Sequence, residues 1–388
     1  MGDEAILESL ARQARVVAPH AELYSFTFGP AGHAMLKLGD PDDPSEASRR
    51  HELFRPGKAD PRRLSISAFL LRAQALSMLL HIEQLDALAY AGGYWLHDLN
   101  PVNFAAISGV LRIARGMGRR VGVIGVGAGP LESSAGKRRV RLALENAEAL
   151  TVRDEHSRRV LIDAGLSRVE LTADPALELP SAPQSEAELI LERAGLDPNQ
   201  PLAIITPCAW FRMSEFYSRR DQHIAAMERS LAIVADGLAE AGMQLLMLAS
   251  MAPEDTLTSR RILSLMRGQT ATAVIEAIDL LPGQVQALIG RARLLVSMRL
   301  HPLIFGLNCG VPLVAVDYDA KVRELCGRAG IEQWMVDPGQ GDFSGAALDL
   351  VRSLLDDPSK QLAMAARGRS AMVARLAGNA AAIRRLVR

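Results

Sequence analysis

A basic cluster in the last third of the chain carries the side chains best suited to chemistry. Arg299, His301 and Lys321 lie near the ends of two apolar runs, Leu294–Val296 and Pro312–Val316, which are typical of buried strands. A helix-length apolar segment separates the runs, so the pattern predicts a β–helix–β unit. Ligands of open α/β sheets bind at the carboxyl ends of such strands. Because burying three cations together is costly without an anion, the cluster predicts a site for an anionic substrate.

The backbone around Pro302 bears on how these side chains are presented. Proline biases the residue before it away from helix, so Arg299 and His301 are expected in extended or turn backbone and to project to the same side. A helix beginning near Pro302 would direct its positive N-terminal end at a ligand held by Arg299. The local sequence leaves one alternative open, a solvated arginine beside a histidine that only caps the helix.

The first half of the chain has glycines at two expected strand ends. Gly92 and Gly93 follow one strand, and Gly125 and Gly127 follow the next. Glycines there allow a ligand to approach backbone N–H groups, although they can equally serve tight turns alone. The second cluster departs from the dinucleotide fingerprint and is followed by no suitable ribose-binding acid, so a nicotinamide cofactor is not expected.

Arg153 lies at the end of a further strand, with Asp154 suited to cap the helix that follows. We expect Arg153 to project into the same cleft as the glycine clusters; the alternative is a surface salt bridge within the helix. The sequence lacks the histidine, cysteine, phosphate-loop and serine-elbow motifs of metal, redox, nucleotide and hydrolase sites. We therefore expect no metal and no cofactor.

Strand and helix patterns alternate along 388 residues, which is too long for one ordinary core. The predicted fold class is α/β, with two Rossmann-like domains facing across a cleft. In the first domain we expect a strand near Glu22–Phe28, an irregular loop from Gly29 to Arg63 and a helix near Ile66–His81. The predicted organisation is an N-terminal domain over 1–179, a linker over 180–200, a C-terminal domain over 201–357 and a basic amphipathic helix over 358–388.

Composition narrows the partners and the compartment. Lysine plus arginine equals aspartate plus glutamate at 44 each, and aromatic residues make up 4%, so a nucleic-acid partner is not expected. Three widely spaced cysteines indicate a reducing compartment rather than a disulfide scaffold. With no signal peptide and no apolar run of spanning length, we expect a cytoplasmic protein.

The segment 358–388 has seven basic residues and no acidic one. Its apolar residues recur at helical spacing, at Leu362, Met372, Leu376, Ile383 and Val387, and arginines flank this stripe. The simpler interpretation is a helix that crosses back onto the first domain, with its arginines reaching water. The alternative is peripheral contact of the basic face with anionic membrane at the inner face of the cell.

Several short motifs, taken in order, resemble the polysaccharide pyruvyltransferase family. They are Gly2-Asp-Glu-Ala-Ile-Leu7, Gly92-Gly-x-x-x-x-Asp98, Val152-Arg-Asp-Glu155, Ala173-Asp-Pro175, Ser297-Met-Arg-Leu-His301 and Pro312-Leu-Val-Ala-Val-Asp-Tyr-Asp-Ala-Lys321. The resemblance implies a glycosyltransferase-B-like arrangement and transfer of pyruvate from phosphoenolpyruvate to a sugar of a cell-surface polymer, as a ketal or an enolpyruvyl group. Family members usually have a strand and a glycine-rich turn before the first motif, so the resemblance implies that the first strand is absent here or that the start is misassigned.

The resemblance also implies roles for residues. Phosphate and carboxylate groups of the donor favour fixed cations, and His301 can act as general acid or base with Arg299 in the catalytic group. The expected donor-binding residues are Arg153, Ser297, Arg299, His301, Tyr318 and Lys321. The expected acceptor-side or backbone-approach residues are Asp3, Gly92, Gly93, Asp98, Gly125 and Gly127.

The implied partners are phosphoenolpyruvate and a saccharide acceptor, free or lipid-linked. Two alternatives stay open: a nucleotide-sugar-dependent glycosyltransferase of the same architecture, for which Glu324 is the candidate ribose-binding carboxylate, and a non-catalytic member of the family.

Overall fold

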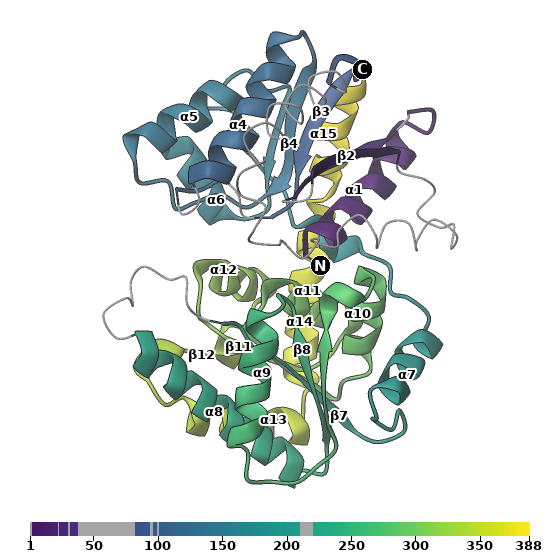
Figure 1. Cartoon of the computed structure of the whole chain (residues 1–388), viewed down its shortest axis with the longest axis vertical. Coiled ribbons are helices and arrows are strands. Elements are labelled where there is room, and N and C mark those ends of the chain that lie inside the picture. Colours follow the sequence, from purple (N-terminus) through teal and green to yellow (C-terminus); the bar gives the residue numbers. More distant parts are fainter. Residues whose placement is uncertain are drawn as a thin grey trace. The chain divides into compact units, whose positions relative to one another are not determined.

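The computed structural model describes residues 2–21, 23–29, 32–37, 82–93, 96–98, 101–209 and 220–388. These residues form two compact units, labelled by element in Figure 1. The first unit comprises Gly2–Pro175 together with Arg375–Arg388, and the second comprises Ala176–Ala374. Each unit is built on a parallel sheet with helical connections, as the alternating pattern predicted.

The sheet of the first unit has the order β3-β4-β5-β6. Its strands are β3 (Ala87–Ala91), β4 (Arg120–Val126), β5 (Ala149–Val152) and β6 (Glu170–Leu171). The connections are α4 (Pro101–Gly116), α5 (Ser134–Leu144) and α6 (Glu155–Asp163), whose apolar side chains share one core with β4 and β5. On the other face, a Cβ added at Gly122 would lie 2.6 Å from Leu386, so α15 (Ala377–Val387) packs closely there. Helix α1 (Gly2–Val17) packs beside α15.

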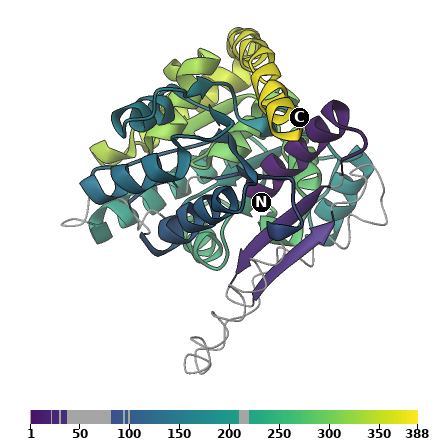
Figure 2. The ribbon, with the colours of Figure 1, turned by 90° about the horizontal axis from the view of Figure 1, so that it is seen from above.

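A separate hairpin follows α1. Strand β1 (Tyr24–Gly29) pairs antiparallel with β2 (Gly32–Lys37), with Gly29 opposite Gly32 at the turn, and Figure 2 shows this purple two-stranded ribbon. The prediction of a strand at this point is confirmed, but the prediction that an irregular loop begins at Gly29 is wrong for residues 32–37. Gly29 and Gly32 are typical of a loop, but glycine at these positions also suits a hairpin. The helix expected near 66–81 lies outside the described residues.

The second unit has a six-stranded parallel sheet of order β12-β11-β10-β7-β8-β9. Its strands are β7 (Leu202–Thr206), β8 (Gln244–Ala249), β9 (Thr272–Glu276), β10 (Leu294–Ser297), β11 (Leu313–Val316) and β12 (Met335–Val336). The chain runs outward from β7 to β9 and then returns to the other side of β7 at β10. Loops after β7 and β10 therefore diverge, which makes this the switch point where ligands of such sheets bind.

The reversal of direction also divides the helices of the second unit into two layers, because right-handed crossovers put opposite excursions on opposite faces. One layer contains α8 (Arg220–Glu240), α9 (Glu254–Leu265) and α13 (Ser344–Asp356). The other contains α10 (Pro282–Gly290), α11 (Leu300–Cys309), α12 (Ala320–Ala329) and α14 (Ser359–Ala374). Every residue of β7, β8, β10 and β11 is buried, as expected of parallel strands covered on both faces.

Two predicted domain boundaries need correction. The expected linker over 180–200 contains α7 (Gln184–Arg193), which packs on α10 within the second unit, and Gln284 donates a 2.7 Å hydrogen bond to Glu186. The units divide between Pro175 and Ala176. The expected single helix over 358–388 is in fact two helices, α14 and α15, which belong to different units. This segment contains no proline after Pro358 that would mark the break.

The C-terminal apolar stripe is used for internal packing. Met372, Leu376 and Ile383 are buried, and the expected return of this segment to the first unit is confirmed by α15. The arginines at 367, 375, 384 and 388 are exposed. Membrane contact thus stays a prediction that depends on charge, because most of the apolar face is occupied. Within the described ranges, no helix has the length and apolar character needed to cross a membrane.

Candidate functional site

A fixed guanidinium lies beside the switch point of the second unit. Arg299 follows β10, and its Nη2 donates a 2.5 Å hydrogen bond to Oδ1 of Asp255, in the first turn of α9. Asp255 is fully buried and also accepts hydrogen bonds from the amides of Ala209 at 3.0 Å and Met251 at 2.9 Å. Since the loops after β7 and β8 both hold this carboxylate, Asp255 fixes the direction of the Arg299 side chain.

Ser297 fixes the backbone of the same arginine. Its Oγ accepts a hydrogen bond from the Arg299 amide at 3.0 Å, donates to the Arg299 carbonyl at 2.9 Å and lies 2.6 Å from Oγ1 of Thr206. The Arg299 backbone is consequently extended, as predicted, with φ −97° and ψ 134°. The Ser297 side chain is itself buried and its hydroxyl is engaged in these contacts. Ser297 therefore holds the backbone of Arg299 in this structure, and its expected contact with a donor stays a prediction.

His301 lies in the first turn of α11, which begins at Leu300. The prediction of extended backbone at His301 is therefore wrong, and the argument that it must project with Arg299 no longer holds. The first turn closes through a 3.3 Å hydrogen bond from the Leu303 amide to the Arg299 carbonyl. Pro302 is accommodated because amides of the first turn have no partner within the helix. His301 is thereby held at the positive end of α11, with its ring centroid 6.5 Å from that of Phe305.

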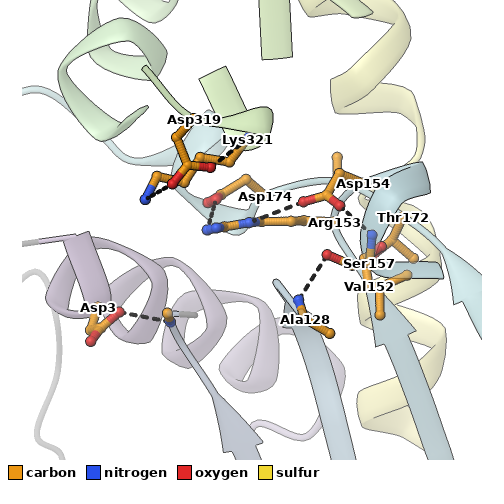
Figure 3. Close-up of polar contacts among 12 residues, drawn as sticks. Asp3, Ala128, Val152, Arg153, Asp154, Ser157, Thr172, Asp174, Asp319 and Lys321 are labelled. Carbon is orange, nitrogen blue, oxygen red and sulfur yellow. Dashed lines mark hydrogen bonds and ion pairs between the residues drawn. The ribbon is translucent and has the colours of Figure 1, made fainter. Parts of the chain in front are cut away.

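Cys208, Tyr318 and Lys321 complete the cluster. Burial raises the pKa of Cys208, which Arg299 and Lys321 oppose, and it raises the pKa of Tyr318 well above its usual range. The thiol and the phenol are thus neutral near pH 7. Lys321 Nζ lies 5.4 Å from the centroid of the Tyr318 ring and 3.2 Å from Oδ2 of Asp319, the ion pair drawn in Figure 3. The structure thus brings Arg299, Tyr318 and Lys321 together around one thiol, and their role in donor binding stays a prediction.

The charge of Arg299 is secure. Burial alone would lower the pKa of its guanidinium, but its electrostatic interactions, including the hydrogen bond to Asp255, raise that pKa. The Nη2 of Arg299 donates its hydrogen bond to Asp255, whereas the Nε is buried without an acceptor among the described residues. An unmade hydrogen bond of this kind is costly, and an anionic oxygen would satisfy it.

The first unit holds a second buried guanidinium, that of Arg153 at the end of β5. Its Nη1 donates a 2.8 Å hydrogen bond to Oδ2 of Asp174, and its Nε lies 3.5 Å from Oδ2 of Asp154, as Figure 3 shows. Asp154 also caps α6 by accepting from the Ser157 amide at 2.7 Å, which confirms the predicted N-cap. The alternative of a surface salt bridge within the helix is wrong, because Arg153 is buried and its close partner comes from the segment after β6.

The glycine clusters are brought together with Asp3, but their amides have internal partners. Asp3 Oδ1 accepts from the Gly93 amide at 2.7 Å, Gly125 donates to Thr151 Oγ1 at 2.8 Å, and Gly127 donates to the Gly93 carbonyl at 3.2 Å. These three N–H groups are not available to a ligand in this conformation. Gly92, with φ 107°, and Gly125, with φ 62°, adopt backbone that favours glycine, which supports the alternative of tight turns.

Asp98 has a capping role in this structure. Its Oδ2 accepts hydrogen bonds from the amides of Glu132 and Ser133, each at 2.8 Å, at the start of α5. The structure therefore places this predicted acceptor-side residue as a support for the turn before the helix.

The argument that an anion must compensate the buried cations needs correction. The chain supplies its own carboxylates: Asp255 for Arg299, Asp319 for Lys321 and Asp174 for Arg153. Sequence reasoning missed Asp255 and Asp174 as site residues. Both follow strands of the two sheets, so the argument applied to Arg299 and Lys321 would have found them had it been applied to acidic residues. The advantage of the site for an anion is therefore that its cations are already held in fixed positions.

Comparison of the sequence with models of known families identifies the family of this chain. The model of a family described as polysaccharide pyruvyl transferase matches residues 1–320. The chain belongs to this family. The resemblance inferred from the short motifs is thereby confirmed, and membership makes the chain one of a family of transferases. No curated protein sequence matches the chain.

The similarity to one solved structure, that of MnaA, confirms the fold class. MnaA of S. aureus, solved with UDP, is 10% identical with a TM-score of 0.56, over 96% of this chain and 92% of that chain. HepE of Anabaena, in complex with UDP and glucose, is 15% identical with a TM-score of 0.49, over 81% of this chain and 80% of that one. At these identities the similarity concerns the fold alone. The chain is an α/β protein with two Rossmann-like units of the glycosyltransferase-B-like class.

Proposed function

We propose that the chain transfers pyruvate from phosphoenolpyruvate to a pair of hydroxyls on a sugar of a cell-surface polysaccharide or its lipid-linked precursor. The product is a pyruvate ketal, and phosphate is released. Family membership supports pyruvyl transfer in general. The observation that carries the choice of an anionic donor is the buried Nε of Arg299, which has no acceptor among the described residues.

Donor binding is assigned to the strand ends of the second unit. Arg299 presents a guanidinium whose other side is fixed by Asp255, so little side-chain entropy is lost when an anion binds. Lys321 adds a second cation beside Tyr318. Arg153, the fixed guanidinium of the first unit, is a further proposed contact for an anionic group of phosphoenolpyruvate, which carries both a carboxylate and a phosphate. The saccharide acceptor is assigned to the first unit, in the region of Asp3 and Gly92.

The chemistry requires proton transfer and stabilisation of charge. A proton is added to the methylene carbon of phosphoenolpyruvate, leaving an oxocarbenium-like centre at C2. One sugar hydroxyl attacks C2 and phosphate leaves with the electrons of its C–O bond; the second hydroxyl then closes the ketal, and the two hydroxyl protons are released. His301 is the group suited to hold and move a proton, and the fixed cations stabilise the departing phosphate. This scheme uses neither a metal nor a redox cofactor.

The direct test is phosphate release from phosphoenolpyruvate in the presence of a panel of saccharides, with the product examined for a ketal. The His301→Ala variant should lower kcat by about 100-fold or more, since general acid–base catalysis contributes about that much. His20→Ala, at an exposed histidine, is the matched control and should keep the parent rate. Near-normal turnover of His301→Ala at saturating donor would refute the assignment of the proton carrier.

The same preparation separates the alternatives. If a nucleotide sugar is consumed with release of nucleotide and phosphoenolpyruvate is not, the chain is a glycosyltransferase of the same architecture. If neither donor binds in a calorimetric titration, the chain is a non-catalytic member of the family. Phosphate release that depends on the saccharide supports the proposal over both.

A further inference from the structure

Asn379, in the first turn of α15, is a fully buried polar side chain in a segment that follows residues 1–320, the part matched by the family model. Asparagine is a poor helix former, and a buried amide is tolerated only when its hydrogen bonds are made. Asn379 meets this condition with two partners from distant parts of the chain. These partners lead directly to the Arg153–Asp174 ion pair.

The contacts form a continuous chain of hydrogen bonds. The Gly125 amide donates to Oγ1 of Thr151 at 2.8 Å, and the Thr151 hydroxyl donates to Oδ1 of Asn379 at 2.8 Å. Asn379 Nδ2 in turn donates to the Ala173 carbonyl at 3.2 Å. Thr151 is also fully buried. Each bond in such a chain polarises the next, and loss of one member leaves a buried group unsatisfied.

Asn379 thereby holds the backbone next to both members of the ion pair. Thr151 lies on β5, and Arg153 follows directly after that strand ends at Val152, two residues further along the chain. Ala173 directly precedes Asp174, whose Oδ2 is 2.8 Å from Arg153 Nη1. A side chain on α15 therefore fixes the spacing between two segments, one carrying the cation and the other its carboxylate.

The packing around Asn379 leaves little room for adjustment. A Cβ added at Gly125 would lie 2.9 Å from the Pro175 ring and 3.3 Å from Asn379 Nδ2. A Cβ added at Gly378 would lie 2.7 Å from Thr172 Cγ2. The start of α15 is thus seated against both segments, and a change at Asn379 should be transmitted to them.

We propose that Asn379 is a positioning residue for the Arg153–Asp174 pair, which makes α15 part of the anion-binding machinery of the first unit. The proposal rests on the proposed function in one respect, that Arg153 takes part in binding phosphoenolpyruvate. Displacement of a fixed guanidinium by about 1 Å is enough to lose much of its benefit to a bound anion. Asn379 itself contacts no substrate in this scheme.

The test compares isosteric and conservative variants by calorimetric titration with phosphoenolpyruvate. Asn379→Leu and Thr151→Val remove the hydrogen-bonding groups with little change in volume, and each should raise the Kd by about 10-fold. Thr151→Ser keeps the hydroxyl and should retain tight binding. In an Arg153→Ala background, Asn379→Leu should have no further effect on the Kd, because the group through which it acts is gone.

Two controls on the same helix separate positioning from general loss of stability. Leu386→Ala removes a buried contact of α15 with Gly122 but leaves the hydrogen-bond chain untouched. It should lower the Tm without a comparable rise in Kd. Arg384→Ala changes an exposed side chain and should change neither quantity.

The outcomes distinguish this proposal from the proposed function. If the parent protein binds phosphoenolpyruvate and Asn379→Leu changes the Kd no more than Leu386→Ala does, or adds fully to Arg153→Ala, the positioning role is wrong. If the parent does not bind phosphoenolpyruvate, the proposed function fails, and crystal structures of the parent and of Asn379→Leu decide the positioning role. An Arg153–Asp174 contact that is unchanged in the variant overturns it, and a displaced contact supports it.

Discussion

Arg299 and Asp255 form an ion pair in which only the arginine retains slight exposure, 16% for its side chain against 0% for that of Asp255. Removing one partner of a buried pair leaves the other charge uncompensated. We expect Arg299→Ala to lower the free energy of unfolding by about 3 kcal/mol, besides its loss of donor binding. Urea unfolding of the second unit measures this change.

The double variant Arg299→Gln with Asp255→Asn tests the cause of that loss. It removes both charges, so it should be more stable than Arg299→Ala while remaining inactive. If Arg299→Ala were as stable as the parent, the pair would contribute nothing and the idea of a guanidinium fixed by Asp255 would lose its support.

The three cysteines should be poorly reactive in the folded protein. Burial raises the pKa of Cys309 to about 11, and burial with Asp317 and Glu332 raises that of Cys326 to about 12. At pH 8 the thiolate fraction of Cys309 should be about 100-fold below that of an ordinary thiol. We expect slow labelling by iodoacetamide at pH 8 and rapid labelling of all three cysteines in urea. A thiol that reacts within seconds in the folded protein would contradict this.

The same shifts set the sign of a pH effect. A thiol whose pKa is raised on folding holds its proton longer in the native than in the unfolded state. Its contribution to stability is therefore unchanged well below the ordinary value of 9.0 and falls as the pH rises from about 9 toward 11. Thermal unfolding between pH 8 and pH 11 should show a Tm that falls as the pH rises. The fall should be smaller in Cys309→Ser than in the parent.

At the scale of single residues, the sequence predicted the cations of the site better than it predicted the residues that bind them through hydrogen bonds and ion pairs. Arg299 and Lys321 could be predicted to lie together because neighbouring strand ends share an edge of the sheet, whereas Tyr318 was expected there from the family resemblance alone. The contacts of Asp255 and Ser297 with Arg299 could not be predicted from the sequence. The partner of a buried charge depends on which strands are neighbours, and the strand order is a property of the whole sheet. The orientation of His301 failed for a smaller reason, a helix that starts two residues earlier than its proline suggested.

Between elements, α14 approaches the backbone at the end of α12 closely. A Cβ added at Gly368 would lie 2.5 Å from the backbone of Ala329, which cannot move without shifting α12. We expect Gly368→Ala to destabilise the second unit by about 2 kcal/mol, since overpacking costs about 1–3 kcal/mol. Differential scanning calorimetry would show the lower Tm.

Gly109, within α4, is the matched control because a Cβ there meets nothing within 4 Å. Gly109→Ala should stabilise the first unit by about 0.5–1 kcal/mol, the usual gain from replacing glycine in a helix interior. If both alanine substitutions acted in the same direction, helix propensity rather than packing would explain them.

The parallel strands were predictable because each is an apolar run bounded by turn residues, and β10 and β11 lie where the pattern placed them. The division of 358–388 into two helices was not, because alanine, leucine and arginine recur through both. Gly378 and Asn379 are weak helix formers that lie just after the break, but Gly368 lies within α14, so glycine alone does not locate the bend.

For the whole molecule, the first unit should depend on α15, which covers one face of its sheet. We expect a chain ended after Ala374 to lose the thermal transition of the first unit and keep that of the second. Calorimetry of the shortened chain, with the transitions assigned by Gly109→Ala and Gly368→Ala, measures this. Two intact transitions in the shortened chain would show that α15 is dispensable for the fold.

The second unit is one continuous stretch of chain, whereas the first consists of two stretches on either side of it. On the ribosome, Ala176–Ala374 can therefore complete its core while the first sheet still lacks the helix that covers one face. The unit that is synthesised first therefore completes its folding last. One face of its sheet stays exposed until the second unit and α15 have been synthesised. We would look for chaperone dependence, and for the effect of slowed translation, in the first half of this chain.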